Sequence, residues 1–281
     1  MRKVLKSLLF VGLLLLGILW YVKYVVTDGD AVQLDVEKLA PQDGRVLVIF
    51  PHPDDEVSVC GTIALLDNAG IETNYLCLTR GEKGAKEKGQ TALNLMKERT
   101  QELKNSAAIL GIDILVQDTL PDGELSAMND SIIKDVILRE INRFKPETII
   151  TYDTNKGLYG HLDHIKTSRN VVQLCEQYSD SSFFSVNSVV SFTLPEKLVE
   201  VFLNNSKKFK NRFYKINDLN LPKPEFAVKT FSSRSQVEAV LNNYNKRKII
   251  SNLMPHKRWL PKDLYYYIHD REYFYYSWKR N

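Results

Sequence analysis

The chain has 281 residues, of which 38 are Lys or Arg and 34 are Asp or Glu, and its formal net charge is +4. This small excess, with acids and bases interleaved, argues against a nucleic-acid-binding protein, and a hydrophobic content of 44% argues against a disordered one. The length suffices for one large α/β domain, which is the prediction adopted; it leaves the oligomeric state open.

The N-terminus departs from this average, because three basic residues within the first six positions precede the uncharged run of residues 8–22. The apolar stretch continues past Lys23 to Val26. Its length predicts a membrane anchor in residues 1–26 that contacts the bilayer through residues 8–26. Lys23 is expected to extend its amine to the membrane interface.

Two other interpretations of this segment stay open. A basic start followed by a short apolar run is also typical of a signal peptide, whose removal would give a secreted protein, although residues 25–28 make a poor cleavage site. A buried core helix is the third interpretation. For an uncleaved single-pass anchor, the basic flank predicts that residues 27–281 lie outside the cytoplasm.

A polar linker is expected over residues 27–44, and strands alternate with helices from residue 45 onwards. Apolar runs without polar alternation predict buried strands, and runs with helical periodicity predict the helices between them. The expected strands are residues 45–50, 71–79, 112–116, 148–152 and 186–193, and the expected helices are residues 55–68, 91–110, 128–144 and 161–178. This order predicts an α/β fold: a Rossmann-like, mostly parallel sheet with helices on both faces, preceded by one transmembrane helix.

The pattern weakens beyond about residue 195, although this part is assigned to the same domain, residues 45–281. A short helix at 198–203, strands at 212–216 and 226–228, and a longer helix at 235–253 are expected. The aromatic tail at 265–278 is interpreted as packing against the domain or as the lip of an interface.

The remaining histidines and the three cysteines give no indication of a second site. His256 and His269 lie in the weakly patterned region and are interpreted as surface or interface residues. Cys60, Cys77 and Cys175 are each in an apolar stretch and lack the close spacing of metal ligands, so buried thiols are expected.

Two loops at strand ends carry most of the reactive side chains. The strand at 45–50 runs directly into Pro51-His52-Pro53-Asp54-Asp55-Glu56, and the strand at 148–152 leads through a polar loop to Tyr159-Gly160-His161-Leu162-Asp163-His164. Open α/β sheets bind ligands beyond the carboxyl ends of their strands. One acid, with Asp54 favoured, is expected to cap the following helix, but a cap needs only one acid and leaves His52 unexplained.

Three of the five histidines lie in these two loops. A spacing of three residues puts His161 and His164 on the same face of a first helical turn. Two imidazoles and a carboxylate with one open position are what catalytic Zn²⁺ requires, and a carboxylate that is not a ligand is then needed as a base. The loops therefore predict a metal-dependent enzyme.

Together with Thr79-Arg80-Gly81-Glu82 and the pair Arg99 and Glu102, these motifs resemble the PIG-L (LmbE-like) family of zinc-dependent N-acetylglucosaminyl de-N-acetylases, over about residues 45–180. The resemblance implies a Rossmann-like α/β hydrolase that removes the acetyl group from an N-acetylglucosamine-containing glycan, glycolipid or glycoconjugate. It implies Zn²⁺ as cofactor, with another divalent metal such as Fe²⁺ as the alternative. Pro51 stands where the family usually has a small residue, which should alter the turn without removing a ligand.

The same resemblance assigns roles at the matching positions. His52, Asp55 and His164 would bind the metal, and Asp54 would be the general base that activates the attacking water. This division is chemically coherent, because the base must not itself be a ligand.

Further roles follow from the resemblance for the second loop. His161 would stabilise the tetrahedral intermediate or protonate the leaving amine, with Asp163 tuning its charge. Tyr159 would help to hold the developing oxyanion, although a surface tyrosine is the alternative. Glu56 either supports the metal ligands or solvates the helix start.

Several alternatives remain at this point. Two pairs of charged residues have two possible roles: Arg80 with Glu82, and Arg99 with Glu102. They line the pocket, or the first pair simply belongs to a charged loop and the second to a solvated helix face. The same metal centre could hydrolyse a different amide, or the domain could be a sugar-binding module without turnover. A base beside a complete ligand set argues against the binding module, since binding alone does not need one.

Overall fold

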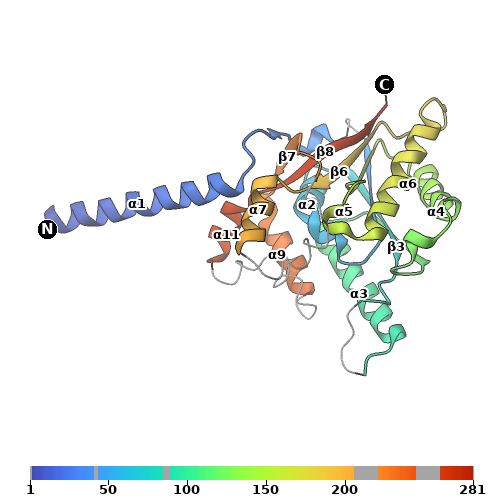
Figure 1. The fold of residues 1–281 in the computed structure, drawn as a ribbon, viewed down its shortest axis with the longest axis horizontal. Helices are drawn as coiled ribbons and strands as arrows, with labels where there is room; N and C mark the ends of the chain where they lie inside the picture. Colours follow the sequence, from blue (N-terminus) through green and yellow to red (C-terminus); the bar gives the residue numbers. More distant parts are fainter. Residues whose placement is uncertain (1, 41–43, 85–88, 206–220, 245–259, 281) are drawn as a thin grey trace.

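The computed structural model describes residues 2–40, 44–84, 89–205, 221–244 and 260–280. These residues form a sheet of eight strands in the order β1-β7-β8-β6-β5-β2-β3-β4 (Figure 1). The strands are β1 (Val32–Gln33), β2 (Arg45–Phe50), β3 (Glu72–Thr79), β4 (Ile114–Leu120), β5 (Thr148–Tyr152), β6 (Ser188–Thr193), β7 (Phe226–Lys229) and β8 (Arg271–Lys279). Neighbours pair in parallel except at β8, which runs antiparallel to β6 and β7.

Strand β2 shows why the central strands are apolar throughout. Val48 and Phe50 face one side of the sheet and Leu47 and Ile49 the other, and all four are fully buried. Each such side chain contributes about 1.5–3 kcal/mol of transfer free energy when it leaves water. A strand covered on both faces therefore has no polar alternation, and the predicted mostly parallel α/β sheet is confirmed.

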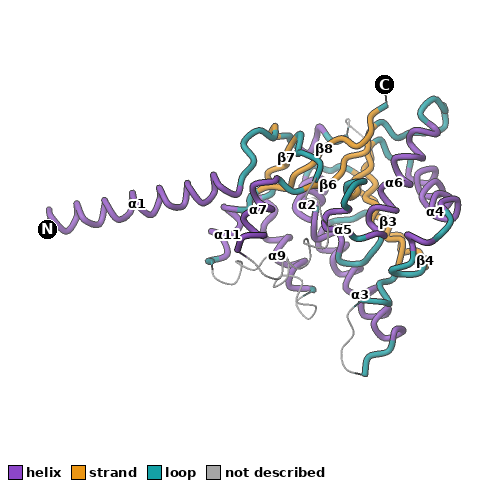
Figure 2. The backbone as a smooth tube through the Cα atoms, in the orientation of Figure 1, coloured by secondary structure: helices purple, strands orange, loops and turns teal. Residues whose placement is uncertain are grey.

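Helices cover both faces of this sheet, as Figures 1 and 2 show. On the side of Val48 lie α2 (Cys60–Asn68), α3 (Ala92–Leu110) and α9 (Arg234–Asn243); on the side of Ile49 lie α4 (Asp130–Phe144) and α6 (Leu162–Tyr178). Short 3₁₀ turns, η1 (Val36–Lys38), η2 (Asp55–Ser58), η3 (Leu125–Ala127) and η4 (Phe231–Ser233), complete the connections. The three cysteines are buried free thiols, as predicted.

Helix α1 (Arg2–Val26) projects from the domain and exposes most of its apolar side chains (Figure 1). Its residues Lys3–Val26 have a mean hydropathy of 2.2 in the most apolar window and are long enough to cross a membrane. Only its C-terminal end packs, on α7 (Glu196–Asn205) and α11 (Lys262–Ile268). There the Lys23 amine, which the sequence predicts at a membrane interface, is held 2.6 Å from the Asp270 carboxylate of the domain.

The structure differs most from the sequence prediction after residue 195. The aromatic tail is an interior element rather than an appendage, because β8 is inserted between β6 and β7. Phe274 is fully buried there and pairs with Phe192 on one side and Phe226 on the other. The pattern could not reveal this, since both partner strands are remote in sequence and both sheet faces are apolar.

Other boundaries shift by a few residues, and some predictions cannot be compared. Helix α7 is longer than expected, and α9 accounts for the first part of the predicted helix at 235–253. The predicted strand at 212–216, the remainder of that helix and His256 lie outside the described residues. His269 is half-buried just after α11, with its ring centroid 4.7 Å from that of Tyr265.

The predicted helix at 55–68 is two elements, η2 and α2, and its expected cap is wrong. Asp54 precedes η2 with φ of 89°, and its side chain forms no capping hydrogen bond. The N–H groups of Gly61 and Thr62, in the first turn of α2, instead donate to the Glu272 carboxylate at 2.7 and 2.8 Å. A residue of β8 thus stabilises the positive end of a helix more than two hundred positions earlier.

This arrangement gives stability a pH dependence. Withdrawal from water raises the pKa of Glu272 from 4.5 to about 7, although the bonds from Thr62 and Gly61 act in the opposite direction. In this window the folded protein keeps a proton that the unfolded chain releases. The free energy of unfolding therefore falls as pH rises from about 4.5 to about 7.

We predict that Glu272→Gln removes this contribution, because glutamine does not titrate. Thermal unfolding of the full chain, measured across this pH window, should show the wild-type Tm declining relative to that of the variant. Glu225→Gln, at an exposed position, is the control and should keep the wild-type slope. Parallel Tm curves for wild type and Glu272→Gln would contradict the assignment.

Candidate metal centre

Strands β2 and β5 lie side by side in parallel, so their carboxyl ends open at the same edge of the sheet. From β2 the chain continues into β3 and β4 on one side, whereas β5 and β6 lie on the other. The strand order therefore reverses between β2 and β5. A crevice forms at such a point in α/β sheets, and both predicted loops leave the sheet there.

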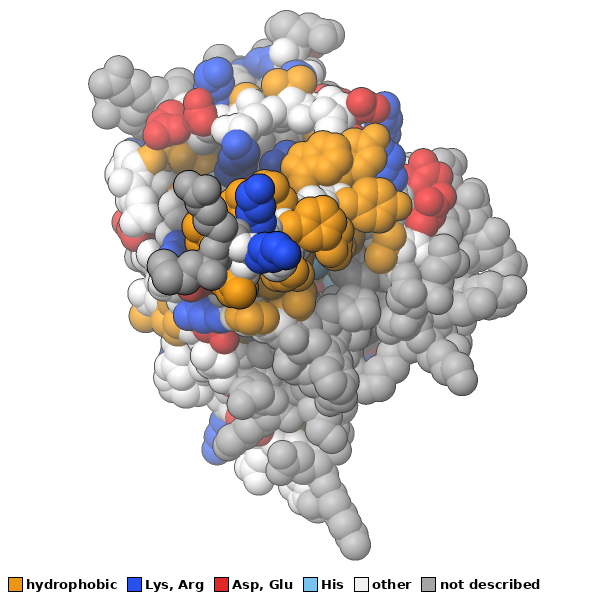
Figure 3. All heavy atoms as spheres, turned by 90° about the vertical axis from the view of Figure 1, so that its left-hand side faces the viewer, with side chains coloured by type: hydrophobic (Ala, Val, Ile, Leu, Met, Phe, Trp, Pro, Cys, Tyr) orange, Lys and Arg blue, Asp and Glu red, His pale blue; other side chains and the backbone are white. Residues whose placement is uncertain are grey.

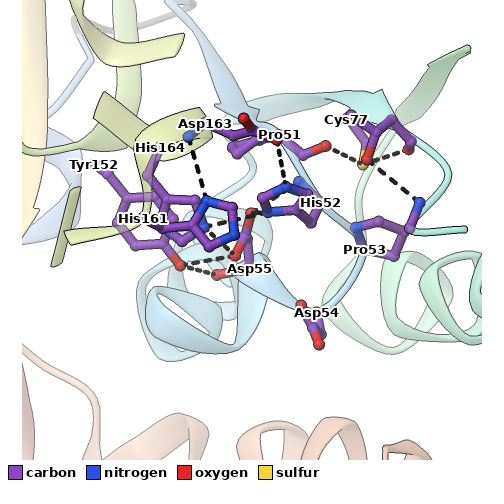
Figure 4. Close-up of polar contacts among 12 residues, drawn as sticks. Pro51, His52, Pro53, Asp54, Asp55, Cys77, Tyr152, His161, Asp163 and His164 are labelled. Carbon is purple, nitrogen blue, oxygen red and sulfur yellow. Dashed lines mark hydrogen bonds and ion pairs between the residues drawn. The ribbon is translucent and has the colours of Figure 1, made fainter. Parts of the chain in front are cut away.

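The loop after β2 turns sharply and separates its acids. The Pro51 carbonyl accepts from the Thr79 N–H at 2.9 Å, which ties the strand end to β3. Asp54 then adopts φ of 89°, an uncommon backbone conformation for a residue with a side chain, and its N–H donates to Glu56 Oε2 at 3.0 Å. As a result, His52 and Asp55 point together and Asp54 points elsewhere (Figure 4).

Glu56, whose role the sequence leaves open, stabilises this turn by accepting the Asp54 N–H. Its side chain is fully buried and also accepts a hydrogen bond from the Tyr244 hydroxyl. Burial raises the pKa of Glu56 to about 7, and the Tyr244 bond partly offsets this rise. The described contacts make Glu56 a support for the Asp54 backbone rather than a solvated helix residue.

The loop after β5 is shaped by the buried carboxylate of Asp153. It accepts N–H groups of Asn155, Lys156 and Leu158 at 3.0, 2.6 and 2.7 Å, and so folds the chain into the short helix α5 (Gly157–Gly160). Gly157 has φ of 51°, and a Cβ atom there would lie 2.5 Å from Cβ of His164. Only glycine allows this loop to approach His164 so closely.

Three ligand atoms face one point between the two loops (Figure 4). His52 Nδ1 lies 3.2 Å from His164 Nε2 and 3.3 Å from Asp55 Oδ2, and His164 Nε2 lies 3.2 Å from Asp55 Oδ1. A tetrahedral metal with bonds of about 2.0 Å requires ligand atoms about 3.3 Å apart. The spacing of these atoms, in which one Asp55 oxygen lies near His52 and the other near His164, is compatible with a divalent metal between the three residues.

The outer nitrogens of both imidazoles are also held. His52 Nε2 lies 3.2 Å from Asp163 Oδ2 and 3.3 Å from Asp122 Oδ1, and His164 Nδ1 lies 3.0 Å from the Gly157 carbonyl oxygen. Such partners fix the tautomer and the orientation of metal-binding histidines. The inner nitrogens are thereby left to face the common point.

Tyr152, the last residue of β5, completes the support of this cluster. Its ring stacks on that of His164 with a centroid distance of 4.2 Å and an interplanar angle of 5°. Its hydroxyl donates to Asp55 Oδ1 at 3.2 Å and contacts Ser58 Oγ at 2.9 Å. One side chain thus positions two of the three donors.

The electrostatics show how strongly the cluster attracts positive charge. Burial alone would lower the pKa of His52, but hydrogen bonds to Asp163 and Asp55 outweigh it and raise the pKa to about 10. Burial would raise the pKa of Asp55, but the His164 charge and hydrogen bond hold it well below its usual value. The cluster therefore stabilises a cation at this point, whether proton or metal.

Two other sets of donor atoms in the described residues lie within 4.8 Å of one another. One is His52, His161 and His164, which places His161 at the border of the same point. The other is His52, Asp122 and Asp163, whose carboxylates already accept backbone N–H groups: Asp163 from Gly123 at 2.8 Å, and Asp122 from Lys83 at 2.8 Å. The Asp55 carboxylate is engaged in a similar way, since Asp55 Oδ2 accepts the His52 backbone N–H at 2.8 Å. The set of His52, Asp55 and His164 is therefore preferred for its short mutual distances and for the family resemblance, and not for free carboxylate oxygens.

Asp54 lies apart from this cluster. Its carboxylate is paired with the Arg99 guanidinium at 2.8 Å and points away from the imidazoles (Figure 4). Burial raises the pKa of Asp54, and the Arg99 charge acts against that rise. Its side chain is 27% exposed, whereas the side chains of His52, Asp55 and His164 are at most 8% exposed, so Asp54 is the most accessible of the four.

The second loop brings its residues to the same rim. His161 precedes α6, is half-buried, and stacks on His164 with a centroid distance of 4.6 Å. Burial, followed by the charges of His164 and His52, lowers the pKa of His161 to about 4. The half-buried Tyr159 ring lies 6.0 Å from the His161 ring and 5.2 Å from that of His164.

Asp163 has a closer contact with His52 than with His161, the residue whose charge it is predicted to tune. The Asp163 N–H donates to His161 Nδ1 at 3.3 Å, but the carboxylate is bonded to His52 and not to His161. Burial would raise the pKa of Asp163, and the His52 bond outweighs it and lowers the pKa. Asp163 therefore orients the His52 imidazole, and its charge also acts to raise the pKa of His161, so its tuning of His161 stays a prediction.

The structure adds residues that the sequence did not single out. Asp122 appears in the sequence only as part of a Pro-Asp-Gly turn, Tyr152 only as a strand end, and Gly157 only as a loop residue. The sequence leaves open whether Arg99 lines a pocket or lies on a solvated helix face. In the structure Arg99 is buried, and its guanidinium donates to the Pro53 carbonyl as well as to Asp54. For Asp122, Tyr152 and Gly157 the one signal available was position, since they lie at or shortly after the ends of β4 and β5. Arg99 lies within α3 (Ala92–Leu110) and had no such signal.

Comparison with known proteins finds a family model that matches the part of the chain containing both loops. The PIG-L family model, described as GlcNAc-PI de-N-acetylase, matches residues 47–175, from β2 to α6. A probable N-acetyl-alpha-D-glucosaminyl L-malate deacetylase 2 of Bacillus cereus is 34% identical over 133 residues, which are 46% of this chain and 60% of the relative. The diacetylchitobiose deacetylase of Thermococcus kodakarensis is 33% identical over 121 residues, 43% of this chain and 45% of that protein. The chain thus spans less than two thirds of the length of these relatives.

Solved structures share the fold at lower identity. The N,N'-diacetylchitobiose deacetylase from Pyrococcus horikoshii superposes with a TM-score of 0.61 at 20% identity, over 84% of each chain. GalB, a 4-carboxy-2-hydroxymuconate hydratase from Pseudomonas putida, has a TM-score of 0.57 at 15% identity, over 84% of this chain and 98% of its own. These two likenesses concern the fold alone, and the family rests on the sequence match. Residues 47–175, somewhat less than half of the chain, are thus similar to the PIG-L family.

Proposed function

We propose that this protein is a metal-dependent hydrolase that removes the acetyl group from an N-acetylglucosamine-containing glycan, glycolipid or glycoconjugate. The observation that carries the proposal is the buried donor set of His52, Asp55 and His164, with ligand atoms 3.2–3.3 Å apart, inside a PIG-L segment. The names of the relatives support the substrate class, since they include deacetylases of glucosaminyl malate and of diacetylchitobiose.

Zn²⁺ is the metal that we propose, because two imidazoles and one carboxylate with an open position suit it; Fe²⁺ binds similar sets. When bound, the metal supplies Lewis acidity that polarises the amide carbonyl and acidifies a water. His52, Asp55 and His164 would hold it. Asp163 and the Gly157 carbonyl keep the two imidazoles oriented for this task.

The other side chains act on the substrate in this proposal. Asp54 is the general base: its side chain is 27% exposed, and it lies between the proposed ligands His52 and Asp55 in sequence. This role requires the Asp54 carboxylate to turn from its ion pair with Arg99 toward the metal centre. His161 stabilises the tetrahedral intermediate or donates a proton to the leaving amine, and Tyr159 supports the developing oxyanion from the same rim. An amine and acetate would be the products.

Other functions remain as alternatives with a different expected outcome. The fold also occurs in a hydratase, so fold alone does not decide the reaction. A sugar-binding module would not need an acid that is oriented but not a ligand, and the Asp54 and Arg99 pair favours turnover. Hydrolysis of another amide would use the same residues and would differ only in substrate.

The neighbouring acids Asp54 and Asp55 provide a matched test. We expect Asp54→Asn to keep one bound metal per chain but to lower kcat for acetate release from N-acetylglucosamine glycosides by about 10²–10⁴, the usual contribution of a general base. Asp55→Asn should lose metal as well, because it removes a charged donor. Metal content by elemental analysis and acetate release are measured on the full chain.

We therefore expect both variants to lose activity, but only Asp55→Asn to lose metal. If Asp54→Asn retains full activity, Asp54 is not the base. If Asp55→Asn retains full metal occupancy, the proposed donor set is incorrect. A wild-type protein that binds metal tightly yet releases no acetate from any such glycoside would favour the alternative functions.

We further propose that α1 is an uncleaved single-pass anchor with the catalytic domain outside the cytoplasm. The support is the span-length apolar helix together with its ion pair from Lys23 to Asp270, which joins it to the domain. Intact cells or right-side-out vesicles treated with an external protease should lose the domain while the inner membrane is still sealed. Protection until the membrane is breached would contradict the orientation, and domain released into the medium would indicate signal cleavage.

A further inference from the structure

An apolar cavity of about 170 Å³ lies between the metal centre and the end of α1. Its wall next to the site is formed by Val57, Ser58, Leu158 and Tyr159. The remaining wall comes from the end of α1, from α7, α9, α11 and the start of β8, and includes Val26, Leu198, Val237 and Ile268. The cavity thus extends from residues adjacent to the candidate site to the base of the helix that is long enough to span a membrane.

Near the site, a few side chains separate the cavity from the proposed metal ligands. Ser58 bonds to the Tyr152 hydroxyl at 2.9 Å, and Tyr152 bonds to the Asp55 carboxylate at 3.2 Å. Tyr159, on the same wall, has its ring 5.2 Å from that of His164. A molecule in the cavity that contacts Tyr159 is therefore separated from His164 only by the Tyr159 ring.

At the other end, the base of α1 is fixed to the wall of the cavity. Lys23 pairs with Asp270, and Asp270 also accepts from Arg271 Nε at 2.8 Å. The Lys23 amine lies 4.0 Å from the ring centroid of Tyr267. Arg271 itself lines the cavity, so the contacts from Lys23 to Asp270 and from Asp270 to Arg271 link the end of α1 to the cavity wall.

The aromatic residues of α1 indicate where a bilayer would end. Trp20, Tyr21 and Tyr24 are exposed near the end of the helix, and such residues gather at the membrane–water interface. Val26 follows Tyr24 by about 3 Å along the helix axis, at 1.5 Å per residue. Figure 3, viewed from the side of α1, shows hydrophobic side chains gathered on this face. The cavity wall would therefore lie at the level of the lipid head groups.

The chemistry of the lining favours an aliphatic ligand over a sugar. Most lining residues are apolar or aromatic, and the charged ones are already engaged within the protein: Glu272 with the N–H groups of Gly61 and Thr62, and Arg271 with Asp270. A sugar needs many hydrogen-bonding partners, and the polar groups of this lining are few beside its apolar and aromatic surface. An aliphatic chain needs only apolar surface, and gains about fourfold in affinity per methylene at full burial.

We propose that this cavity is the subsite for the aliphatic chain of a membrane-anchored substrate, so that the acetylated sugar reaches the metal centre while its lipid chain lies between α7, α9 and α11. The inference rests on the proposed function and narrows its substrate class to lipid-linked N-acetylglucosamine. It also assigns a task to the C-terminal third of the chain, which lies beyond the family match at residues 47–175.

The first test is a chain-length series on the full protein in lipid nanodiscs. Alkyl N-acetylglucosaminides from methyl to octyl, below their micelle concentrations, should show kcat/KM rising about two- to fourfold per methylene until the cavity is filled. Val237→Trp, which fills the cavity, should reduce the octyl-to-methyl ratio at least tenfold. Ser235→Trp, at an exposed position on the same helix α9, is the matched control and should keep the wild-type ratio.

Enrichment of long chains in the bilayer would also raise the rate, and the variant pair separates the two effects. If Val237→Trp and Ser235→Trp both keep the wild-type ratio, the gain comes from the bilayer alone and the subsite is refuted. A wild-type rate independent of chain length refutes it too.

The second test does not depend on turnover or on the folding of a variant. An octyl N-acetylglucosaminide with a diazirine at the end of its chain is photolysed with the full wild-type protein, and labelled peptides are identified by mass spectrometry. Labels on α7, α9, α11 or the end of α1, competed by unmodified octyl glycoside, support the subsite. Labels confined to other elements overturn it. Absence of acetate release from every glycoside, with the cavity labelled, would refute the proposed deacetylation while retaining the lipid site.

Discussion

The close approach of two imidazoles to one buried carboxylate is the constraint on which the rest of the site depends. With His52 Nδ1, His164 Nε2 and the Asp55 oxygens 3.2–3.3 Å apart and almost without contact with water, the cluster is stable only when a proton or a metal occupies the space between them. The surrounding contacts serve this arrangement. Asp163, Asp122 and the Gly157 carbonyl hold the outer nitrogens, and Tyr152 holds both His164 and Asp55.

The sheet brings these residues together because its strand order reverses between β2 and β5. Two loops that are a hundred residues apart in sequence leave neighbouring strand ends there. Each loop needs backbone conformations that are costly for most residues: at Asp54 after β2, and at Gly157, Leu158 and Gly160 after β5. The conformation at Asp54 separates its side chain from that of Asp55, which allows adjacent acids to have different tasks. The conformation at Gly157 lets the chain pass directly against His164.

Much of this could be predicted from the sequence, and the reasons are physical. Strands such as β2 have apolar side chains on both faces and are bounded by Pro or Gly, so their ends, and the loops that follow, could be located. The direction of side chains within a loop could not. The sequence indicated that His52, Asp55 and His164 would meet, but not that Asp163 would contact His52, or that Arg99 would reach Asp54.

The structure of the C-terminal third, in contrast, could be predicted from the sequence only in small part. The position of β8 depends on pairing with β6 and β7, and the residues of the tail contain no signal for partners so remote in sequence. Yet β8 supplies Glu272 to the start of α2 and Arg271 to the wall of the apolar cavity. The family segment therefore carries the candidate chemistry, while the segment outside it shapes the surroundings of the site and receives the end of α1.

The most direct test of the central claim is X-ray absorption at the metal edge on the full chain loaded with one equivalent of Zn²⁺. The donor set predicts four nitrogen or oxygen ligands at about 2.0–2.1 Å, with the multiple-scattering signal of two imidazoles. A third imidazole would indicate that His161 and not Asp55 is a ligand. A shell of six oxygen ligands, or any sulfur, would contradict the assignment of His52, Asp55 and His164 as the metal site.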